Sequence, residues 1–152
     1  MLIALAWLVS TILVILTTPR EKIREAMVIF MFKQLITWSI GLAVVELGLI
    51  EYPVRLFPNA NKTSFTFEYY VYPMICVVFN LHYPENKSRL RQLMHYVYFC
   101  SVMSLGEHLI EKYTELITYI HWEWYTTWIT LFLTFFLSRQ YYRWFYRLNK
   151  SN

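Results

Sequence analysis

The stretch AMVIFMFKQLITWSIGLAVVELGLI, from Ala26 to Ile50, decides the fold class of this chain. Its only charged residues are Lys33 and Glu46. A helix that crosses a bilayer needs about 20 consecutive, mostly apolar residues, and this stretch exceeds that length. The sequence therefore predicts a membrane-spanning helix here.

The composition of the whole chain agrees with this interpretation. Of 152 residues, 57% are hydrophobic and 16% are charged, against roughly 25% charged in soluble domains. Short connections favour antiparallel neighbours in one bundle. We therefore predict a single all-α domain over residues 1–152, an integral membrane bundle of about five transmembrane helices. Their expected ranges are 2–18, 26–50, 65–83, 92–111 and 117–138.

The positive charges predict the orientation of the bundle. The segments PREKIRE, PENKSRLR and RQYYRWFYRLNK hold three, three and four Lys or Arg residues, whereas the opposite loops hold only Arg55, Lys62 and Lys112. Because Lys and Arg are enriched in cytoplasmic loops, the N-terminus is expected outside and the C-terminus in the cytoplasm. The basic, aromatic tail then fits an interfacial belt that contacts the lipid bilayer rather than a nucleic-acid site.

Several classes of catalytic or ligand site find no support in the sequence. All ten acidic residues are Glu, and none of the three Gly residues lies in a Gly-rich loop, which excludes phosphate-cradling and EF-hand loops. Cys76 and Cys100 lie in apolar runs without CxxC spacing, so we interpret them as packing residues. No G-x-S-x-G or H-E-x-x-H motif is present. These features favour a non-enzymatic protein.

Polar side chains are expected to gather near the outer end of the bundle. A charge at the bilayer centre costs at least about 2.5–3.5 kcal/mol, so ionisable residues in such helices suggest function. Residues within a turn of the interface, such as Glu111 and His121, can instead be solvated. Four predicted helices contribute residues to this layer. These residues are Glu46, Glu68, Glu107, His108, Glu111, His121 and Glu123.

The inner half of the bundle holds fewer polar residues, chiefly Lys33, Asn80 and His95. Lys33 is expected either to extend toward the cytoplasmic interface or to pair with Asn80. At the outer junction, Arg55 is expected near Glu51 as a surface ion pair, within reach of Glu46 or the acids of the fourth helix.

Three uses of the outer polar layer stay open. The first is a structural, sensing or accessory role, in which the layer holds the bundle together or binds a small ligand or a partner membrane protein. The second is proton- or cation-coupled transport through Glu46, Glu68 and Glu107. The third is a metal-dependent membrane enzyme with Glu107, His108 and Glu111 as ligands. Apart from that metal ion, no cofactor is expected.

Three short motifs carry a resemblance to a known family: Glu51-Tyr-Pro-Val-Arg55, Asn80 with Tyr83-Pro84, and His121-Trp122-x-Trp124. With them, nearly the whole chain resembles an uncharacterised family of small multi-pass membrane proteins from spore-forming Gram-positive bacteria. The resemblance implies a location in the cell membrane and supports the helix count. It implies no catalytic residue.

Overall fold

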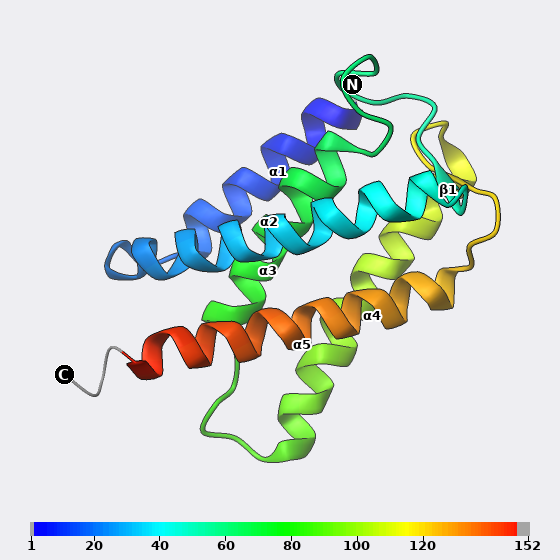
Figure 1. Ribbon diagram of the computed structural model, residues 1–152. Helices are drawn as coiled ribbons and strands as arrows, with labels where there is room; N and C mark the ends of the chain where they lie inside the picture. Colours follow the sequence, from blue (N-terminus) through cyan, green and yellow to red (C-terminus); the bar gives the residue numbers. More distant parts are fainter. Residues whose placement is uncertain (1, 149–152) are drawn as a thin grey trace.

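The computed structural model describes residues 2–148, and this part of the chain is mostly helical (Figure 1). The prediction of a helical protein is therefore confirmed. Lys150, counted above among the inner cations, lies outside the described residues. The five α-helices of residues 2–148 are α1 (Leu2–Thr17), α2 (Ile23–Glu46), α3 (Tyr72–Leu81), α4 (Arg89–Tyr113) and α5 (Trp124–Leu148).

The end of α2 differs from the predicted range because a glycine cap stops the helix before Ile50. Gly48 adopts a positive φ of 68°. Its N–H donates to the Val45 carbonyl, and the next N–H, from Leu49, donates to Val44 at 3.1 Å. This pattern is a Schellman cap, in which glycine takes the left-handed conformation without steric cost.

The fifth helix also begins later than the predicted residue 117. Residues 118–119 form strand β2 (Thr118–Tyr119), which pairs antiparallel with β1 (Ile50–Glu51), and Ile50 lies opposite Tyr119. The apolar pattern runs past the end of α2 without a break, whereas α4 ends beside the charged residues Glu111 and Lys112. The pairing joins the loop after α2 to the loop after α4 at one end of the bundle (Figure 1).

The third predicted helix contains two kinds of turn. A π-helix, η2 (Phe65–Val71), precedes α3, and Pro73 lies at the start of α3. Because Pro73 has no N–H, it cannot donate to the carbonyls one turn before it. Two α2 side chains occupy those carbonyls instead: Thr37 donates to Glu68 at 2.6 Å, and Gln34 donates to Tyr69 at 3.0 Å. The proline thus fixes η2 against α2.

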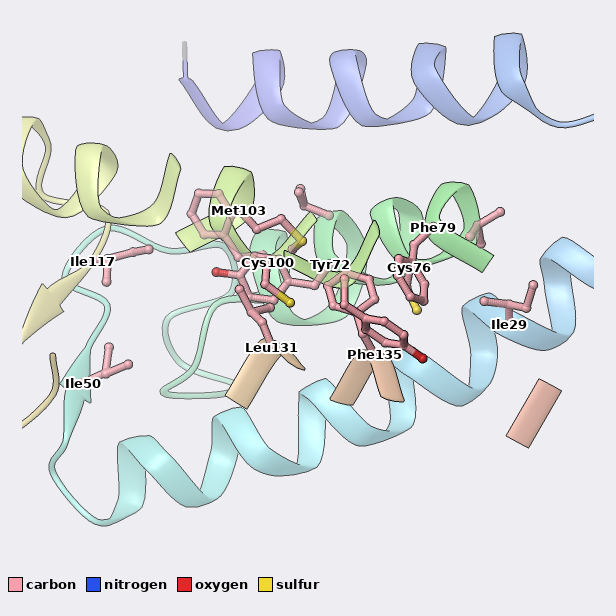
Figure 2. Packing of buried hydrophobic residues seen from close by; sticks show 14 of the residues in the cluster. Ile29, Ile50, Tyr72, Cys76, Phe79, Cys100, Met103, Ile117, Leu131 and Phe135 are labelled. Carbon is pink, nitrogen blue, oxygen red and sulfur yellow. The ribbon is translucent and has the colours of Figure 1, made fainter. Parts of the chain in front are cut away.

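The helices surround a core in which aromatic and sulfur-containing side chains meet. Figure 2 shows Cys76 and Phe79 of α3 beside Phe135 of α5, and the Phe79 and Phe135 ring centroids are 4.6 Å apart. At one end of this core lie Ile50 and Ile117, both buried. The core therefore extends from the paired strands through the length of the bundle.

Helix α1 packs on α3 and η2 through polar and aromatic contacts near its N-terminal half. The Trp7 ring stacks on Tyr70 with centroids 3.7 Å apart. The Tyr70 hydroxyl is also hydrogen-bonded to Thr11 at 2.7 Å, and Trp7 Nε1 donates to Thr66. These contacts fasten α1 beside η2 (Figure 1).

One helical segment of residues 2–148 is both long and apolar enough to cross a membrane. It runs from Arg20, where the 3₁₀ turn η1 (Arg20–Lys22) leads into α2, to Glu46, with a mean hydropathy of 1.8 over its most apolar window. The segments Leu2–Thr17 and Phe65–Leu81 are apolar but shorter. By length and composition alone, then, the structure supports one crossing.

Candidate functional site

A small polar cavity lies between α2, η2, α4 and α5, next to β1. Its volume is about 50 Å³, enough for a few water molecules but far below the roughly 300–1,000 Å³ of a typical small-molecule pocket. The polar groups that line it include Thr37, Tyr52, Glu68, Tyr72, Glu107 and Thr134. Glu68 and Glu107, two residues expected in the polar layer, therefore share one cavity.

Glu107 is one of the two most highly connected polar residues of this cavity, together with Thr127. The Glu107 side chain is buried. Oε1 accepts hydrogen bonds from Tyr119 at 2.7 Å and from Thr127 at 2.8 Å, and Oε2 accepts one from Tyr72. Because these donors belong to β2, α5 and α3, one carboxylate joins three elements to α4.

Glu68 has a different environment on η2. Its Oε1 accepts a hydrogen bond from the Tyr52 hydroxyl at 3.0 Å. Tyr52 lies in the loop after β1 and is buried. Its burial raises its pKa well above the ordinary value, and the neighbouring charges of Glu68 and Glu107 act in the same direction. Tyr52 therefore stays protonated and remains a hydrogen-bond donor.

At Gly41, the position of α2 that faces Glu68, there is no space for a side chain. A Cβ on Gly41 would lie 2.9 Å from Glu68 Cγ and 2.8 Å from Thr63 Oγ1. Thr63 is fully buried, and its hydroxyl has no hydrogen-bond partner among residues 2–148. Gly41 is thus required for η2 and the loop before it to approach α2 closely.

Lys33 lies one helical turn from Thr37 and is completely buried. Its Nζ donates to Thr134 Oγ1 at 2.5 Å and lies 4.4 Å from the centre of the Phe135 ring. Thr134 also lines the polar cavity. Lys33 therefore neither extends to the interface nor pairs with Asn80, and its contacts are on the side of α5.

The remaining residues of the predicted layer do not join the cavity. Glu46 forms an exposed ion pair with Lys62, 3.4 Å apart, with side chains 75% and 72% exposed. His121 and Glu123 lie exposed in the turn before α5. The sequence suggested one layer, but the structure separates it into a buried pair and a solvated rim.

The three candidate metal ligands do not converge. His108 contacts Glu111 at 3.8 Å on a partly exposed face of α4 and lines a recess with Trp124 and Trp128. Glu107 instead faces the interior. Within residues 2–148, no three His, Cys or Glu side chains are grouped closely enough to hold a metal ion.

Arg55 organises the loop after β1 rather than pairing with an acid. Its guanidinium donates to the backbone carbonyls of Tyr52 at 2.7 Å, Asn61 at 2.9 Å and Pro58 at 3.3 Å. The expected contacts with Glu51, Glu46 or the acids of α4 are not formed. Arg55 thereby holds the backbone that positions Tyr52.

A second buried polar cluster lies toward the opposite end of the bundle. Asn80 donates to Ser138 at 3.3 Å, and Cys76 donates to the same hydroxyl at 3.2 Å. Arg139 is buried, donates to the Asn80 carbonyl and pairs with Glu85. The His95 Nε2 is 3.0 Å from the Phe79 carbonyl oxygen.

Sequence reasoning missed the tyrosine hydroxyl groups that surround the acids, although it predicted that a threonine stripe on the fifth helix faces other helices. Tyr52, Tyr72 and Tyr119 were not assigned to the layer because tyrosine in an apolar run is usual at membrane interfaces. The spacing of Thr127, Thr130 and Thr134 along one face of α5 does carry a usable signal.

No protein-family model, no curated protein and no solved structure matches this chain.

Proposed function

We propose that this chain is a multi-pass integral membrane protein, and one observation carries the proposal. Several helices expose large apolar side chains, while small or polar residues occupy many of their buried positions. On α2 the buried positions are Ala26, Ile29, Lys33, Thr37 and Gly41. Large apolar residues such as Met31 and Leu35 are 64% and 66% exposed.

The same inverted pattern occurs on two further helices. On α1, a helix of almost entirely apolar composition, the one buried residue is Ser10, while Leu16 is 79% exposed. On α5, Thr127 and Thr134 are buried, and Leu133 is 54% exposed. Water-soluble monomers rarely expose continuous apolar surface of this extent, whereas membrane helices meet through small and hydroxyl-bearing residues.

Five crossings follow if α1, α2, η2 with α3, α4 and α5 each traverse the bilayer, with the N-terminus outside and the C-terminus in the cytoplasm. The loop with Arg55 and Lys62 and the loop after Lys112 then lie outside. Arg20, Lys22 and Arg24 lie inside with Lys87, Arg89 and Arg91. This arrangement also agrees with the proposed kinship to small multi-pass membrane proteins of spore-forming Gram-positive bacteria.

The function best supported by the site is a non-enzymatic structural or accessory role in the cell membrane. The acids Glu68 and Glu107 hold the outer loops on the bundle through Tyr52 and Tyr119. The cavity between them is partly open, and its volume of about 50 Å³ leaves room only for water-sized guests. A partner membrane protein would then contact the outer surface that these loops form.

Thiol labelling tests the proposed membrane topology. Cys76 and Cys100 are buried, so an introduced cysteine is the expected target of a membrane-impermeant maleimide. Asn59→Cys, in the outer loop, should react in intact cells, and Asn86→Cys, in the inner loop, only after permeabilisation. Release of the protein from membranes by alkaline carbonate, or the opposite labelling pattern, would contradict the proposal.

A second candidate function, proton- or cation-coupled transport, is favoured by Lys33. A fully buried lysine is costly unless its charge is used or compensated. Thr134, which accepts from Lys33, lines the same cavity as Glu68 and Glu107. Water in that cavity would connect the two acids with the middle of the bundle, and the Ser138, Asn80 and Arg139 cluster continues toward the other end.

Proteoliposomes separate the two candidates. A proton flux that Glu68→Gln abolishes and Glu46→Gln preserves would favour transport, because Glu46 lies exposed outside the cavity. Equal flux in the unchanged protein and in Glu68→Gln would favour the structural role.

A further inference from the structure

A second, much larger cavity lies at the opposite end of the bundle, between α1 and α2. Its volume is about 650 Å³, and Met74 and Val77 of α3 form its floor. Figure 1 shows α1 and α2 diverging from their connecting turn with α3 between them. The groove opens outward, since Ile15 and Met31 on its rims are largely exposed.

The walls of this groove are apolar except at one end. Along α2 they extend from Ile23 to Met31, nine residues whose eight helical rises span about 12 Å. Half of a bilayer hydrocarbon core is about 15 Å thick, so the groove covers most of one leaflet. Three methionines, Met27, Met31 and Met74, line it, and methionine adapts its shape to flexible apolar guests.

The polar end of the groove carries a positive charge. Arg20 is the one charged residue of its lining, and its side chain has no ion pair or hydrogen bond within residues 2–148. The Thr18 hydroxyl beside it is also without a partner in the described chain. Arg20 is the first residue of the helical segment that ends at Glu46. The N-terminal end of this segment, at Arg20, is the positive end of the helix dipole.

The nearby acids do not neutralise this end. Glu25 faces α5, where it accepts a hydrogen bond from Tyr142 at 2.5 Å. Glu21 is exposed and is not part of the groove lining. In the proposed topology, this end lies at the cytoplasmic leaflet, which carries anionic lipids.

We propose that this groove binds one anionic phospholipid, with an acyl chain along α2 and the phosphate at Arg20 and Thr18. This inference rests on the proposed membrane location. It is independent of the acids at the outer end.

Native mass spectrometry of protein from nanodiscs tests the proposal, with equal phosphatidylglycerol and phosphatidylcholine as probes. We expect one phosphatidylglycerol per chain to be retained in preference to phosphatidylcholine. Arg20→Gln should lower this preference about fivefold, the factor for one basic contact. Arg24→Gln, at an exposed position outside the groove, is the matched control and should retain the preference.

A second pair of variants tests the acyl chain. Met27→Trp should fill the groove and reduce retention of both lipids, while Leu35→Trp, exposed on the same helix outside the groove, should not. Equal loss in Arg20→Gln and Arg24→Gln, or no preference in the unchanged protein, would overturn the proposal. So would a lipid-free dimer that Met27→Trp converts to monomer. Failure of the membrane location itself would be seen separately, in the carbonate extraction.

Discussion

The Tyr119 hydroxyl lies 2.7 Å from Glu107 Oε1, so a strand outside the helices is tied directly to an acid in the bundle interior. Burial and the Glu107 carboxylate raise the pKa of Tyr119, which keeps it a donor. The same strand pairs with β1, and the loop after β1 delivers Tyr52 to Glu68. Two loops that are distant in sequence are thus each anchored to one buried carboxylate.

Glu107→Leu should destabilise the bundle because it leaves the hydroxyls of Tyr72, Tyr119 and Thr127 without their acceptor. Hydrogen bonds between membrane helices average roughly 0.6 kcal/mol and reach about 1.7, so three should cost about 2 kcal/mol. Thermal unfolding in detergent measures the effect.

Glu107→Gln, which keeps an acceptor oxygen, should cost less. Glu123→Leu, at an exposed site, is the control, and an unchanged midpoint in Glu107→Leu would refute the structural role.

Gly41→Ala and Gly106→Ala should have opposite effects on stability. In a helix interior, alanine is favoured over glycine by about 0.8–1.0 kcal/mol, and a Cβ at Gly106 meets nothing within 4 Å. At Gly41 the added methyl would lie 2.8 Å from Thr63 Oγ1, and overpacking costs about 1–3 kcal/mol. Unfolding midpoints of the two variants compare these effects, and a stabilised Gly41→Ala protein would show that η2 can move away from α2.

Glu46→Gln should change the unfolding midpoint little, although sequence reasoning grouped Glu46 with the buried acids. Its partner Lys62 is 72% exposed, and exposed ion pairs contribute about 0–1 kcal/mol and weaken with salt. A loss comparable to that of Glu107→Leu would mean that Glu46 enters the bundle. Thermal unfolding at low and high salt distinguishes these outcomes.

Stability should decline at alkaline pH partly because of Tyr52. The pKa of Tyr52 is raised in the folded state, while an unfolded tyrosine ionises near pH 10. Below that pH both states are protonated, and the stability is intact. Above it only the unfolded state loses the proton, so stability falls by up to about 1.36 kcal/mol per pH unit.

Unfolding midpoints between about pH 9 and 11 check this prediction. Tyr52→Phe should lower the midpoint at neutral pH but flatten the alkaline decline. Tyr113→Phe, at a tyrosine that is 72% exposed, is the matched control. An unchanged slope in Tyr52→Phe would contradict the assignment.

The sequence by itself determined the helical class, the approximate position of most helices and the identity of some of the buried polar groups. Apolar runs of about bilayer length and the scarcity of charge are local properties, so periodicity and composition report them directly. The acids Glu68 and Glu107 were also recognised from sequence, because charge within an apolar run is costly wherever the helix packs.

Only the tertiary structure decided which of these groups meet. Glu46 and Glu68 were assigned a similar depth, yet one pairs with Lys62 at the surface and the other faces Glu107 across a cavity. The rotation of each helix about its axis makes this difference, and it depends on the π-turn before Pro73, the close approach at Gly41 and the pairing of β1 with β2. Those features arise from contacts between residues far apart in sequence, which no local pattern specifies.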